Sequence, residues 1–421
     1  MQIETAYFPT IANIKLASKK LSGVAIVTPL SRNLRYSKQY QSNVFFKRED
    51  LQQVRSYKIR GAYNKISSLT KEEIKNGIVC ASAGNHAQGV AISCKLLKIK
   101  GTIFMPTPTP NQKIEQVKMF GEDYIDIVLV GDSFDDANYA AMKQQKELNQ
   151  SYIHPFNDPK VIEGQATVGL EIIEQMENKK IDYVFLPVGG GGLASGLSTV
   201  FKYLSPTTKI IGVEPKGAPS MSNSIKNDKN IELNAIENFV DGAAVKRVGD
   251  LTFSIAKENL HDMITVDEGH ICQTILDLYN KEAIVAEPAA ALSIAALEHY
   301  AEEIKNKNVV CIISGSNNDI TRTAEIKERA MLYAQLKHYF IVKFPQRAGA
   351  LRQFVAEILG PNDDITYFQY TKKTNRENGA AVVGLELKSK KDFEPLVKRM
   401  KDHNFYGDYL NNKPDLFQFL V

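Results

Sequence analysis

The stretch that decides the fold is Pro187-Val188-Gly189-Gly190-Gly191-Gly192-Leu193-Ala194-Ser195-Gly196. The apolar run 181–188 predicts a buried strand leading into it, and a helical pattern at 193–204 follows. Consecutive glycines allow several backbone N–H groups to point at one spot, and the start of a helix adds a partial positive charge. This unit of strand, glycines and helix therefore predicts a phosphate-binding loop.

The glycine pattern leaves two interpretations of that phosphate open. No Lys-Ser or Lys-Thr pair follows the glycines, which excludes a nucleoside-triphosphate loop. However, Gly189, Gly191 and Ala194 fit the G-x-G-x-x-A spacing of dinucleotide-binding loops, and Glu214 follows the next strand, where a ribose-binding acid would lie. A nicotinamide-dependent dehydrogenase therefore remains an alternative on this pattern alone.

Short apolar runs alternate with helical patterns on both sides of the loop. Strands are predicted at 77–81, 101–105, 125–130, 181–188, 209–213 and 308–313, with short extended pieces at 27–30 and 43–47. Helices are predicted at 8–22, 58–69, 86–97, 110–119, 133–148, 159–178 and 193–204. This alternation is typical of α/β proteins with open parallel sheets.

The order of elements changes near the C-terminus. A charged helix at 321–336 is interpreted as a linker. After it we expect a strand at 338–343, a helix at 350–359, strands at 365–371 and 380–387 around a turn at 375–379, a helix at 391–402 and a strand at 416–420. The order β-α-β-β-α-β is that of the ferredoxin-like split βαβ sandwich, an α+β fold.

Length and composition limit the class of protein. A chain of 421 residues predicts two or three domains, and a net charge of +4 with interspersed signs gives no nucleic-acid footprint. No apolar run is long enough to span a membrane, and the N-terminus shows no secretory signal. The seven histidines show no metal-ligand spacing, so no transition-metal site is predicted. The four cysteines form no CxxC pair and are expected to be buried thiols, which points to the cytoplasm.

Lys58 lies in the stretch Arg55-Ser56-Tyr57-Lys58-Ile59-Arg60-Gly61-Ala62, between an extended segment and a helix. A lysine amine that is held deprotonated can condense with an aldehyde. The alternative is an ordinary surface lysine at the start of a helix. The choice between the two depends on residues elsewhere in the chain.

Two further turns lie at predicted strand ends. In 80–89, the N–H groups and the hydroxyl of Ser82 can hold a carboxylate at a helix N-terminus. The alternative is an ordinary Asn85 N-cap, and His86 is not predicted to be an acid or base because it lies past the cap. Ser314 follows the strand 308–313, where a hydroxyl can bond a ring nitrogen; the alternative is a Ser/Gly turn.

These motifs, in this order and spacing over residues 1–320, resemble the serine/threonine dehydratases, a family of fold-type II pyridoxal-phosphate enzymes. The lysine motif has no use in a nicotinamide enzyme, so the resemblance disfavours the dehydrogenase. One departure is Tyr57, where phenylalanine is commoner. Residues 344–351, Phe-Pro-Gln-Arg-Ala-Gly-Ala-Leu, resemble the first loop of the amino-acid-sensing domains called ACT-like. The implied division is a catalytic domain 1–320 with a small subdomain at about 52–150, a linker helix 321–336 and an ACT-like domain 337–421.

The resemblance also implies roles for individual residues. Lys58 would bind pyridoxal phosphate covalently and act as general base. The phosphate would lie on Gly189, Gly190, Gly191, Gly192 and Leu193, Asn85 would bond the 3-hydroxyl, and Ser314 the ring nitrogen. The substrate carboxylate would lie at Ser82, Ala83, Gly84 and Asn85. A neutral serine does not keep the ring nitrogen protonated as an aspartate would, which suits β-elimination better than transamination. Glu287 matches a family motif near the cofactor and is expected to play a supporting role.

The implied reaction converts L-threonine, and secondarily L-serine, to a 2-oxo acid and ammonia in a homotetramer. Isoleucine is the expected inhibitor, through Arg347, Gly349, Ala350 and Leu351. Relatives hold a cation near Glu214, and Ser220 replaces an aspartate there, so a monovalent ion is considered and a tight divalent site is not. The alternatives are a degradative dehydratase or racemase, and a non-enzymatic amino-acid-binding regulator.

Overall fold

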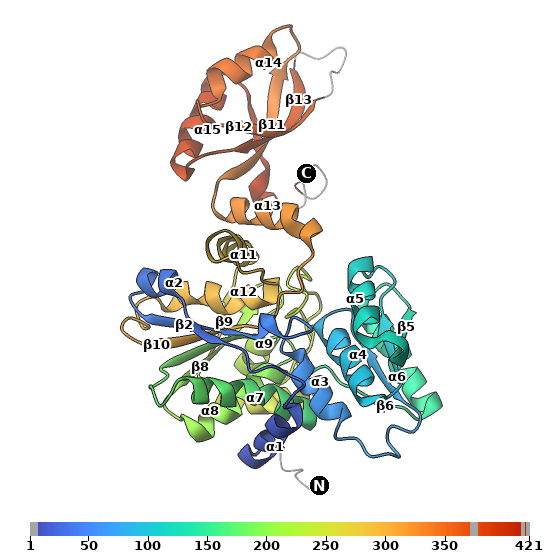
Figure 1. Ribbon diagram of the computed structural model, residues 1–421. Coiled ribbons are helices and arrows are strands. Elements are labelled where there is room, and N and C mark those ends of the chain that lie inside the picture. The colour runs from blue at the N-terminus through green and yellow to red at the C-terminus, as the bar shows by residue number, and fades with distance from the viewer. Residues whose placement is uncertain (1–6, 371–377, 414–416, 418–421) are drawn as a thin grey trace. The chain divides into compact units, whose positions relative to one another are not determined.

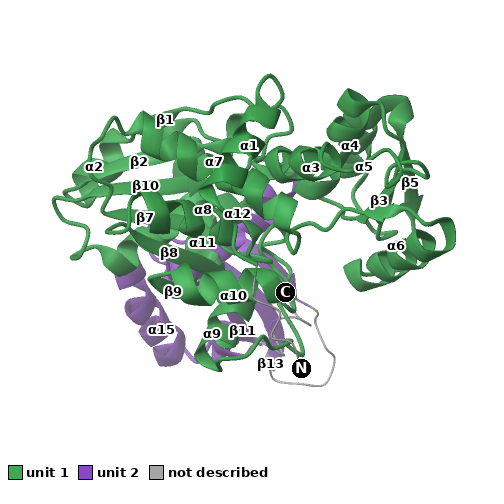
Figure 2. Cartoon of the chain, turned by 90° about the horizontal axis from the view of Figure 1, so that it is seen from below, with its two compact units in different colours: residues 1–320 green, residues 321–421 purple. Residues whose placement is uncertain are grey.

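The computed structural model describes residues 7–370, 378–413 and 417. The chain divides into two compact units, Met1–Ile320 and Thr321–Val421, which are coloured separately in Figure 2. Within the described residues, the first unit contains two sheets and the second contains one.

The larger sheet of the first unit has the strand order β1-β2-β10-β7-β8-β9 and is parallel apart from the β1–β2 pair. Its strands are β1 (Leu30–Arg32), β2 (Asn43–Arg48), β7 (Tyr183–Pro187), β8 (Lys209–Pro215), β9 (Asp262–Val266) and β10 (Asn308–Ile313). Figure 1 shows α12 (Pro288–Ala295) on one face and α8 (Gly192–Leu204) on the other. Because both faces are covered, β7 is buried along its whole length and reads as a continuous apolar run.

The smaller sheet of this unit is parallel, in the order β5-β4-β3-β6. Its strands are β3 (Ile78–Ala81), β4 (Gly101–Met105), β5 (Ile125–Leu129) and β6 (Ser151–Tyr152). Alternate side chains of β3 enter separate apolar clusters. Ile78 and Cys80 pack with α4 (Asn85–Leu97), whereas Val79 and Ala81 pack with α6 (Phe134–Leu148). The four-residue apolar run of β3 therefore reflects burial on both faces.

Helices complete the first unit. They are α1 (Ile11–Leu21), α2 (Leu34–Gln39), α3 (Lys58–Ile66), α5 (Asn111–Gly121), α7 (Pro159–Gln175), α9 (Ser220–Lys226), α10 (Asp250–Asn259) and α11 (Glu268–Glu282). The start of α7 has strong local signals: Asp158 accepts hydrogen bonds from the N–H groups of Lys160 and Val161, and Pro159 occupies the first turn. Because α7 contacts α1, α3 and α8, it links the elements of both sheets.

The second unit begins with α13 (Thr323–Tyr333) and folds into an antiparallel sheet in the order β12-β13-β11-β14. Its strands are β11 (Lys337–Pro345), β12 (Asp364–Tyr370), β13 (Asn378–Glu386) and β14 (Tyr406–Tyr409). The helix α14 (Ala350–Gln353) continues as a π-helical turn at Phe354–Ile358, and α15 (Phe393–Asp402) follows β13. Side chains of the sheet, the π-turn and α15 share one apolar core.

The predicted fold class, with two parallel sheets and a ferredoxin-like C-terminal sandwich, is confirmed. The predicted strand at 416–420 lies outside the described residues apart from Phe417. The fourth strand of the sandwich is instead β14, which pairs with β11 across a register shift between Ile341 and Val342. Its sequence, Tyr-Gly-Asp-Tyr, carries no apolar alternation that would have predicted a strand. The elements β6, β9 and α9 to α12 were likewise not predicted from the sequence.

Candidate functional site

The glycine loop joins β7 to α8. Gly191 has φ +91°, a left-handed conformation that favours glycine, and it forms the N-cap of α8. A Cβ on Gly190 would lie 2.1 Å from the ring of Phe156, so no larger residue fits there without a shift. The hydroxyl of Thr252 donates to the Gly190 carbonyl across 2.6 Å and holds the loop from the other side.

Lys58 is the first residue of α3, and its amine donates a hydrogen bond to the Pro155 carbonyl oxygen across 3.0 Å. Burial lowers the pKa of Lys58 to about 8, while the nearby Glu287 carboxylate acts in the opposite direction. At pH 7 roughly a tenth of such amines are neutral, compared with well under a thousandth for an ordinary lysine. The environment therefore favours a nucleophilic amine.

The turn 82–85 lies between β3 and α4. The N–H of Ser82 donates to the Phe104 carbonyl oxygen, and the Ser82 hydroxyl accepts from the N–H of Gly84. Gly84 is the N-cap of α4, and no side chain caps the helix there. The helix start thus offers N–H groups and a partial positive charge to an anion such as a carboxylate.

Asn85 is held on both sides by polar partners. Its side-chain amide donates to the two oxygens of Glu287 at 2.9 and 2.8 Å, and its carbonyl oxygen accepts from the Asn317 amide at 2.6 Å. Glu287 is 5% exposed, and burial raises its pKa to about 7 although the Asn85 bond acts to lower it. The network fixes which end of the Asn85 amide is the donor.

Ser314 directly follows β10, and its hydroxyl is buried. The side chain is 1% exposed, and its oxygen has no hydrogen-bond partner among the described residues. A buried hydroxyl without a partner costs free energy unless a group from outside the chain supplies the missing bond. This orphaned hydroxyl, together with the glycine loop, fits a bound cofactor that carries a polar ring atom and a phosphate.

A hollow of about 850 Å³ brings most of the predicted site residues together. It is lined by Lys58, by the whole turn Ser82, Ala83, Gly84 and Asn85, and by Gly190 and Glu287, among others. The other predicted site residues, Gly189, Gly191, Gly192, Leu193 and Ser314, are not among the lining residues. The side chain of Leu193 packs into the apolar core, and Ser314 is buried. Two ion pairs, Lys113–Asp241 and Lys246–Asp135, are formed by residues that line the hollow. In each pair one partner comes from a helix of the smaller-sheet part, α5 or α6, and the other from the segment 241–246.

The loop 154–157 was not predicted from the sequence, although Pro155 and Phe156 line the same hollow. His154 accepts hydrogen bonds at Nδ1 from the N–H groups of Phe156 and Asn157. The loop directly follows β6, a strand of two residues that the sequence did not reveal. A His-Pro-Phe-Asn sequence between an unrecognised strand end and the Asp158-Pro159 helix start was the available signal.

Arg60 does not face the hollow but belongs to a buried ion network. Its guanidinium donates to Glu49 and to Glu171, and Lys47 donates to Glu171 as well. The paired carboxylates hold the pKa of Arg60 above its usual value. Because the network joins β2, α3 and α7, it anchors the helix that Lys58 begins.

His86 and Glu214, which were also considered from the sequence, form hydrogen bonds with other parts of the chain. His86 is 3% exposed and its Nε2 donates to the Ile153 carbonyl oxygen at 2.9 Å, while burial lowers its pKa to about 3. Glu214 is fully buried and accepts three hydrogen bonds, from the N–H of Met221 and from the N–H and hydroxyl of Ser222. No group of three or more His, Cys, Asp or Glu in the described part of the chain is arranged to hold a metal ion.

The predicted regulatory residues lie at the turn from β11 into α14. Gly349 has φ +82° and caps α14, Ala350 is buried, and Leu351 is 48% exposed. The Arg347 guanidinium donates to the side chain of Gln353 on the same turn. These contacts are local and leave the side chain of Leu351 accessible.

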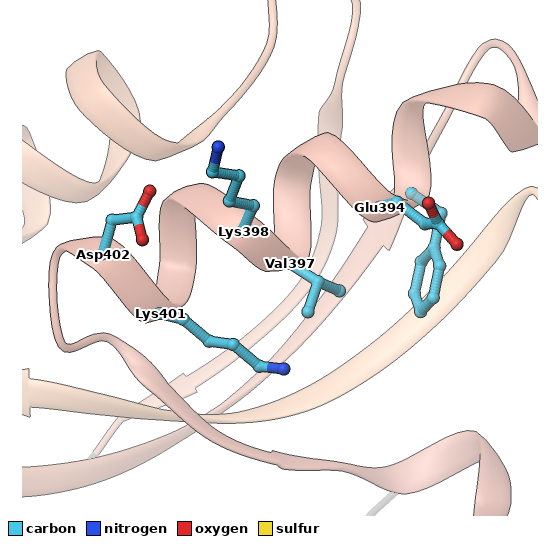
Figure 3. Close-up of a pocket in the computed structure, with 6 residues that line it drawn as sticks. Glu394, Val397, Lys398, Lys401 and Asp402 are labelled. Carbon is cyan, nitrogen blue, oxygen red and sulfur yellow. The ribbon is translucent and has the colours of Figure 1, made fainter.

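The second unit also carries a shallow hollow of about 340 Å³ on α15, shown in Figure 3. Lys398 and Asp402 lie on one side of the helix, and Val397 and Lys401 on the other. Glu394 and Phe393 complete the lining, so the charges are mixed. None of the predicted regulatory residues is among these lining residues.

No helix within the described residues is long and apolar enough to cross a membrane.

Family models match both units of the chain. Residues 21–315 match the model described as pyridoxal-phosphate dependent enzyme. Residues 328–420 match the model described as the C-terminal regulatory domain of threonine dehydratase. The two matches together cover most of the chain.

Curated relatives match the chain over nearly its whole length. The biosynthetic L-threonine dehydratases of Halalkalibacterium halodurans and Bacillus subtilis are each 52% identical to it over 411 residues. The alignments cover 98% of this chain and 99% and 97% of theirs.

Solved structures resemble a large part of the chain. The processed form of threonine deaminase isoform 2 from Solanum lycopersicum aligns with a TM-score of 0.71 at 39% identity, over 78% of this chain and 97% of its own. Maize serine racemase aligns with the same TM-score at 30% identity, over 78% of this chain and 99% of its own.

Proposed function

The chain belongs to the pyridoxal-phosphate-dependent enzymes of the threonine dehydratase family, and from this membership we propose that it converts L-threonine to 2-oxobutanoate and ammonia. The reaction is the first step of isoleucine biosynthesis. The observation that carries the proposal is the Lys58 amine, whose pKa burial lowers to about 8, in the same hollow as the turn 82–85 and Gly190. A nucleophilic amine, an anion-binding helix start and a phosphate loop are the groups this chemistry requires.

The proposed cofactor site follows from these groups. Lys58 would bind pyridoxal phosphate covalently, the loop Gly189, Gly190, Gly191, Gly192 and Leu193 its phosphate, Asn85 the 3-hydroxyl and Ser314 the ring nitrogen. The orphaned hydroxyl of Ser314 supports this assignment. When bound, the cofactor supplies an electron-withdrawing ring that delocalises the charge left at Cα after proton removal.

The residues of the chain would perform the remaining steps. The N–H groups of the turn Ser82, Ala83, Gly84 and Asn85 would orient threonine by its carboxylate. The freed Lys58 amine takes the Cα proton as general base, and the β-hydroxyl leaves with a proton as water. The unsaturated amine that results takes up one water and hydrolyses to 2-oxobutanoate and ammonia. The overall change therefore balances as threonine to 2-oxobutanoate plus ammonia.

A product assay on the purified chain with pyridoxal phosphate tests this proposal. We expect 2-oxobutanoate and ammonia in equal amounts from L-threonine, and a slower release of pyruvate from L-serine. Faster turnover of serine would favour a serine dehydratase, and formation of D-serine without ammonia would favour a racemase. A chain that binds either amino acid without turnover would be a regulator instead of an enzyme.

The same proposal extends to regulation and assembly. The second unit matches a regulatory-domain model, and we propose that isoleucine binds it near Arg347, Gly349, Ala350 and Leu351 and inhibits the enzyme.

We further propose a homotetramer, to be tested by sedimentation. We also propose the domain division 1–320, 321–336 and 337–421, with a small subdomain at about 52–150. The four cysteines are buried thiols, which supports a reducing compartment such as the cytoplasm. Activity in potassium compared with a bulky organic cation tests the monovalent site near Glu214.

A further inference from the structure

Within the described residues, the Lys58 amine donates one hydrogen bond, and its acceptor is a neutral carbonyl oxygen. Its Nζ donates to the Pro155 carbonyl oxygen at 3.0 Å, and no carboxylate accepts from it. A neutral amine that donates one N–H to a carbonyl keeps its lone pair free. A carboxylate in the same place would hold the amine as an ammonium ion, which has no lone pair to act as a base.

The loop that carries this carbonyl is pinned by two neutral histidines. The Nε2 of His86 donates to the Ile153 carbonyl oxygen, before the loop. The Nδ1 of His154 accepts from the N–H groups of Phe156 at 3.2 Å and Asn157 at 2.8 Å, immediately after Pro155. Because Nδ1 accepts, the ring proton of His154 lies on Nε2. Burial lowers the pKa of His154 to about 4, so this arrangement holds at neutral pH.

The far end of the loop touches the phosphate loop and α10. The ring of Phe156 packs against Gly190, where even a Cβ would clash. The side-chain oxygen of Asn157 accepts from the N–H of Leu251 at 3.0 Å. A displacement of the loop would therefore change both its hydrogen bond with the Lys58 amine and its packing against the glycine loop.

We propose that the Pro155 carbonyl oxygen receives the Lys58 amine whenever that amine is free of the cofactor, and that His154 is the positioning residue that holds this carbonyl in place. The inference rests on the proposed role of Lys58 as general base. During turnover the proton leaves Cα and bonds to Nζ, and the resulting ammonium still donates to Pro155. The carbonyl dipole orients the amine in both protonation states without a full negative charge that would trap the proton.

The titratable groups that face Lys58 and His154 come from five elements. They are Tyr57 before α3, His86 of α4, Tyr152 of β6, Asp158 before α7 and Glu287 before α12. Since His86 and His154 both have lowered pKa values, neither changes charge between pH 6 and pH 9. A shift of the pH profile in that window therefore does not come from titration of either histidine.

The test compares three substitutions of His154 in the full-length holoenzyme. His154→Asn keeps an acceptor close to the Nδ1 position, His154→Gln places its amide oxygen near the Nε2 position, and His154→Leu removes the acceptor. We expect His154→Leu and His154→Gln to lower kcat for threonine by about tenfold with little change in KM, and to move the acidic limb of the kcat profile. His154→Asn should recover most of the rate and the profile of the original protein. The visible absorbance of the bound cofactor should be retained in each variant.

The outcomes separate the possible failures. Equal rates and pH profiles in the Asn and Gln variants would overturn the inference, even if the Leu variant fails to bind cofactor. A change in KM alone would also overturn it, because it would assign His154 to substrate binding. If Lys58→Ala retains turnover, the proposed function fails; if Lys58→Ala is inactive while His154→Gln is unaffected, only this inference fails.

Discussion

The backbone N–H of Tyr57 donates a hydrogen bond to the carbonyl oxygen of Ser314 across 3.2 Å. A β-bridge between Ser56 and Gly315 lies beside it. The residue before Lys58 is thereby tied to the residue whose hydroxyl is orphaned at the end of β10. Since both contacts are made by the backbone, they fix the position of the Lys58 backbone relative to that of Ser314. The first turn of α3 and the end of β10 are therefore joined by backbone contacts.

Replacing Gly190 by alanine should weaken cofactor binding. The new Cβ would lie 2.1 Å from the ring of Phe156, so the loop or the ring must move. Overpacking of this kind costs about 1–3 kcal/mol, which corresponds to a roughly 5- to 150-fold loss of affinity for pyridoxal phosphate. Equilibrium titration of the cofactor absorbance measures the loss.

Two variants control this experiment. In Gly190→Ala combined with Phe156→Ala, the ring that causes the clash is absent, so part of the affinity should return. At Gly84 a Cβ would meet nothing within 4 Å, and Gly84→Ala should bind the cofactor normally. An equal loss in the single and double variants would show that the clash is not the cause.

The rate of cofactor attachment should reveal the lowered pKa of Lys58. Only the neutral amine attacks the aldehyde, so the rate should rise with pH and level off above about 8, the pKa that burial gives this lysine. Absorbance after mixing cofactor-free protein with pyridoxal phosphate gives the rate. A lysine dipeptide, whose amine titrates normally, corrects for titration of the cofactor. A protein rate that keeps rising in parallel with the dipeptide would contradict the prediction.

Glu287→Gln should move the same profile to lower pH. The Glu287 carboxylate stabilises the charged form of Lys58 and so raises its pKa against the effect of burial. Without that charge, burial acts unopposed and the pKa of Lys58 falls further, so the plateau should begin at a lower pH. Glutamine still offers an oxygen to the Asn85 amide. An unchanged or higher half-point would mean that Glu287 does not act on Lys58 through its charge.

The chemistry-bearing motifs were predictable because each is local in sequence. Gly189–Gly192 and the turn at Ser82 directly follow apolar strands, and the carboxyl ends of parallel strands line a common crevice. Their convergence on Lys58 could be inferred only through the family resemblance. The structure brings Lys58, the turn and Gly190 to one hollow.

The contacts that hold these motifs were not predictable, because they join segments far apart in the chain. The Lys58 amine meets the Pro155 carbonyl across 97 positions of the sequence, and β6 before that loop is only two residues long. Arg60 looks like an ordinary helical arginine, yet its partners Glu49 and Glu171 come from a 3₁₀ turn and from α7. Likewise β14 has an uninformative sequence and becomes a strand by pairing with β11.

Removing the second unit should abolish inhibition by isoleucine. The first unit, ending at Ile320, contains the whole hollow. A chain ending there should bind pyridoxal phosphate, which its absorbance verifies, and should turn over threonine at a rate that isoleucine does not change. The full chain is the control and should lose activity as isoleucine is added. Inhibition that persists in the shortened chain would locate the effector site in the first unit.

The central claim, that Lys58 carries the chemistry, is tested most directly by the rate of 2-oxobutanoate release from L-threonine in Lys58→Ala. Lys75→Ala, at an exposed lysine, is the control and should match the original rate. We predict a fall of at least about a thousandfold for Lys58→Ala, because both the covalent link and the general base are lost. A rate within a few-fold of the original protein would contradict the account.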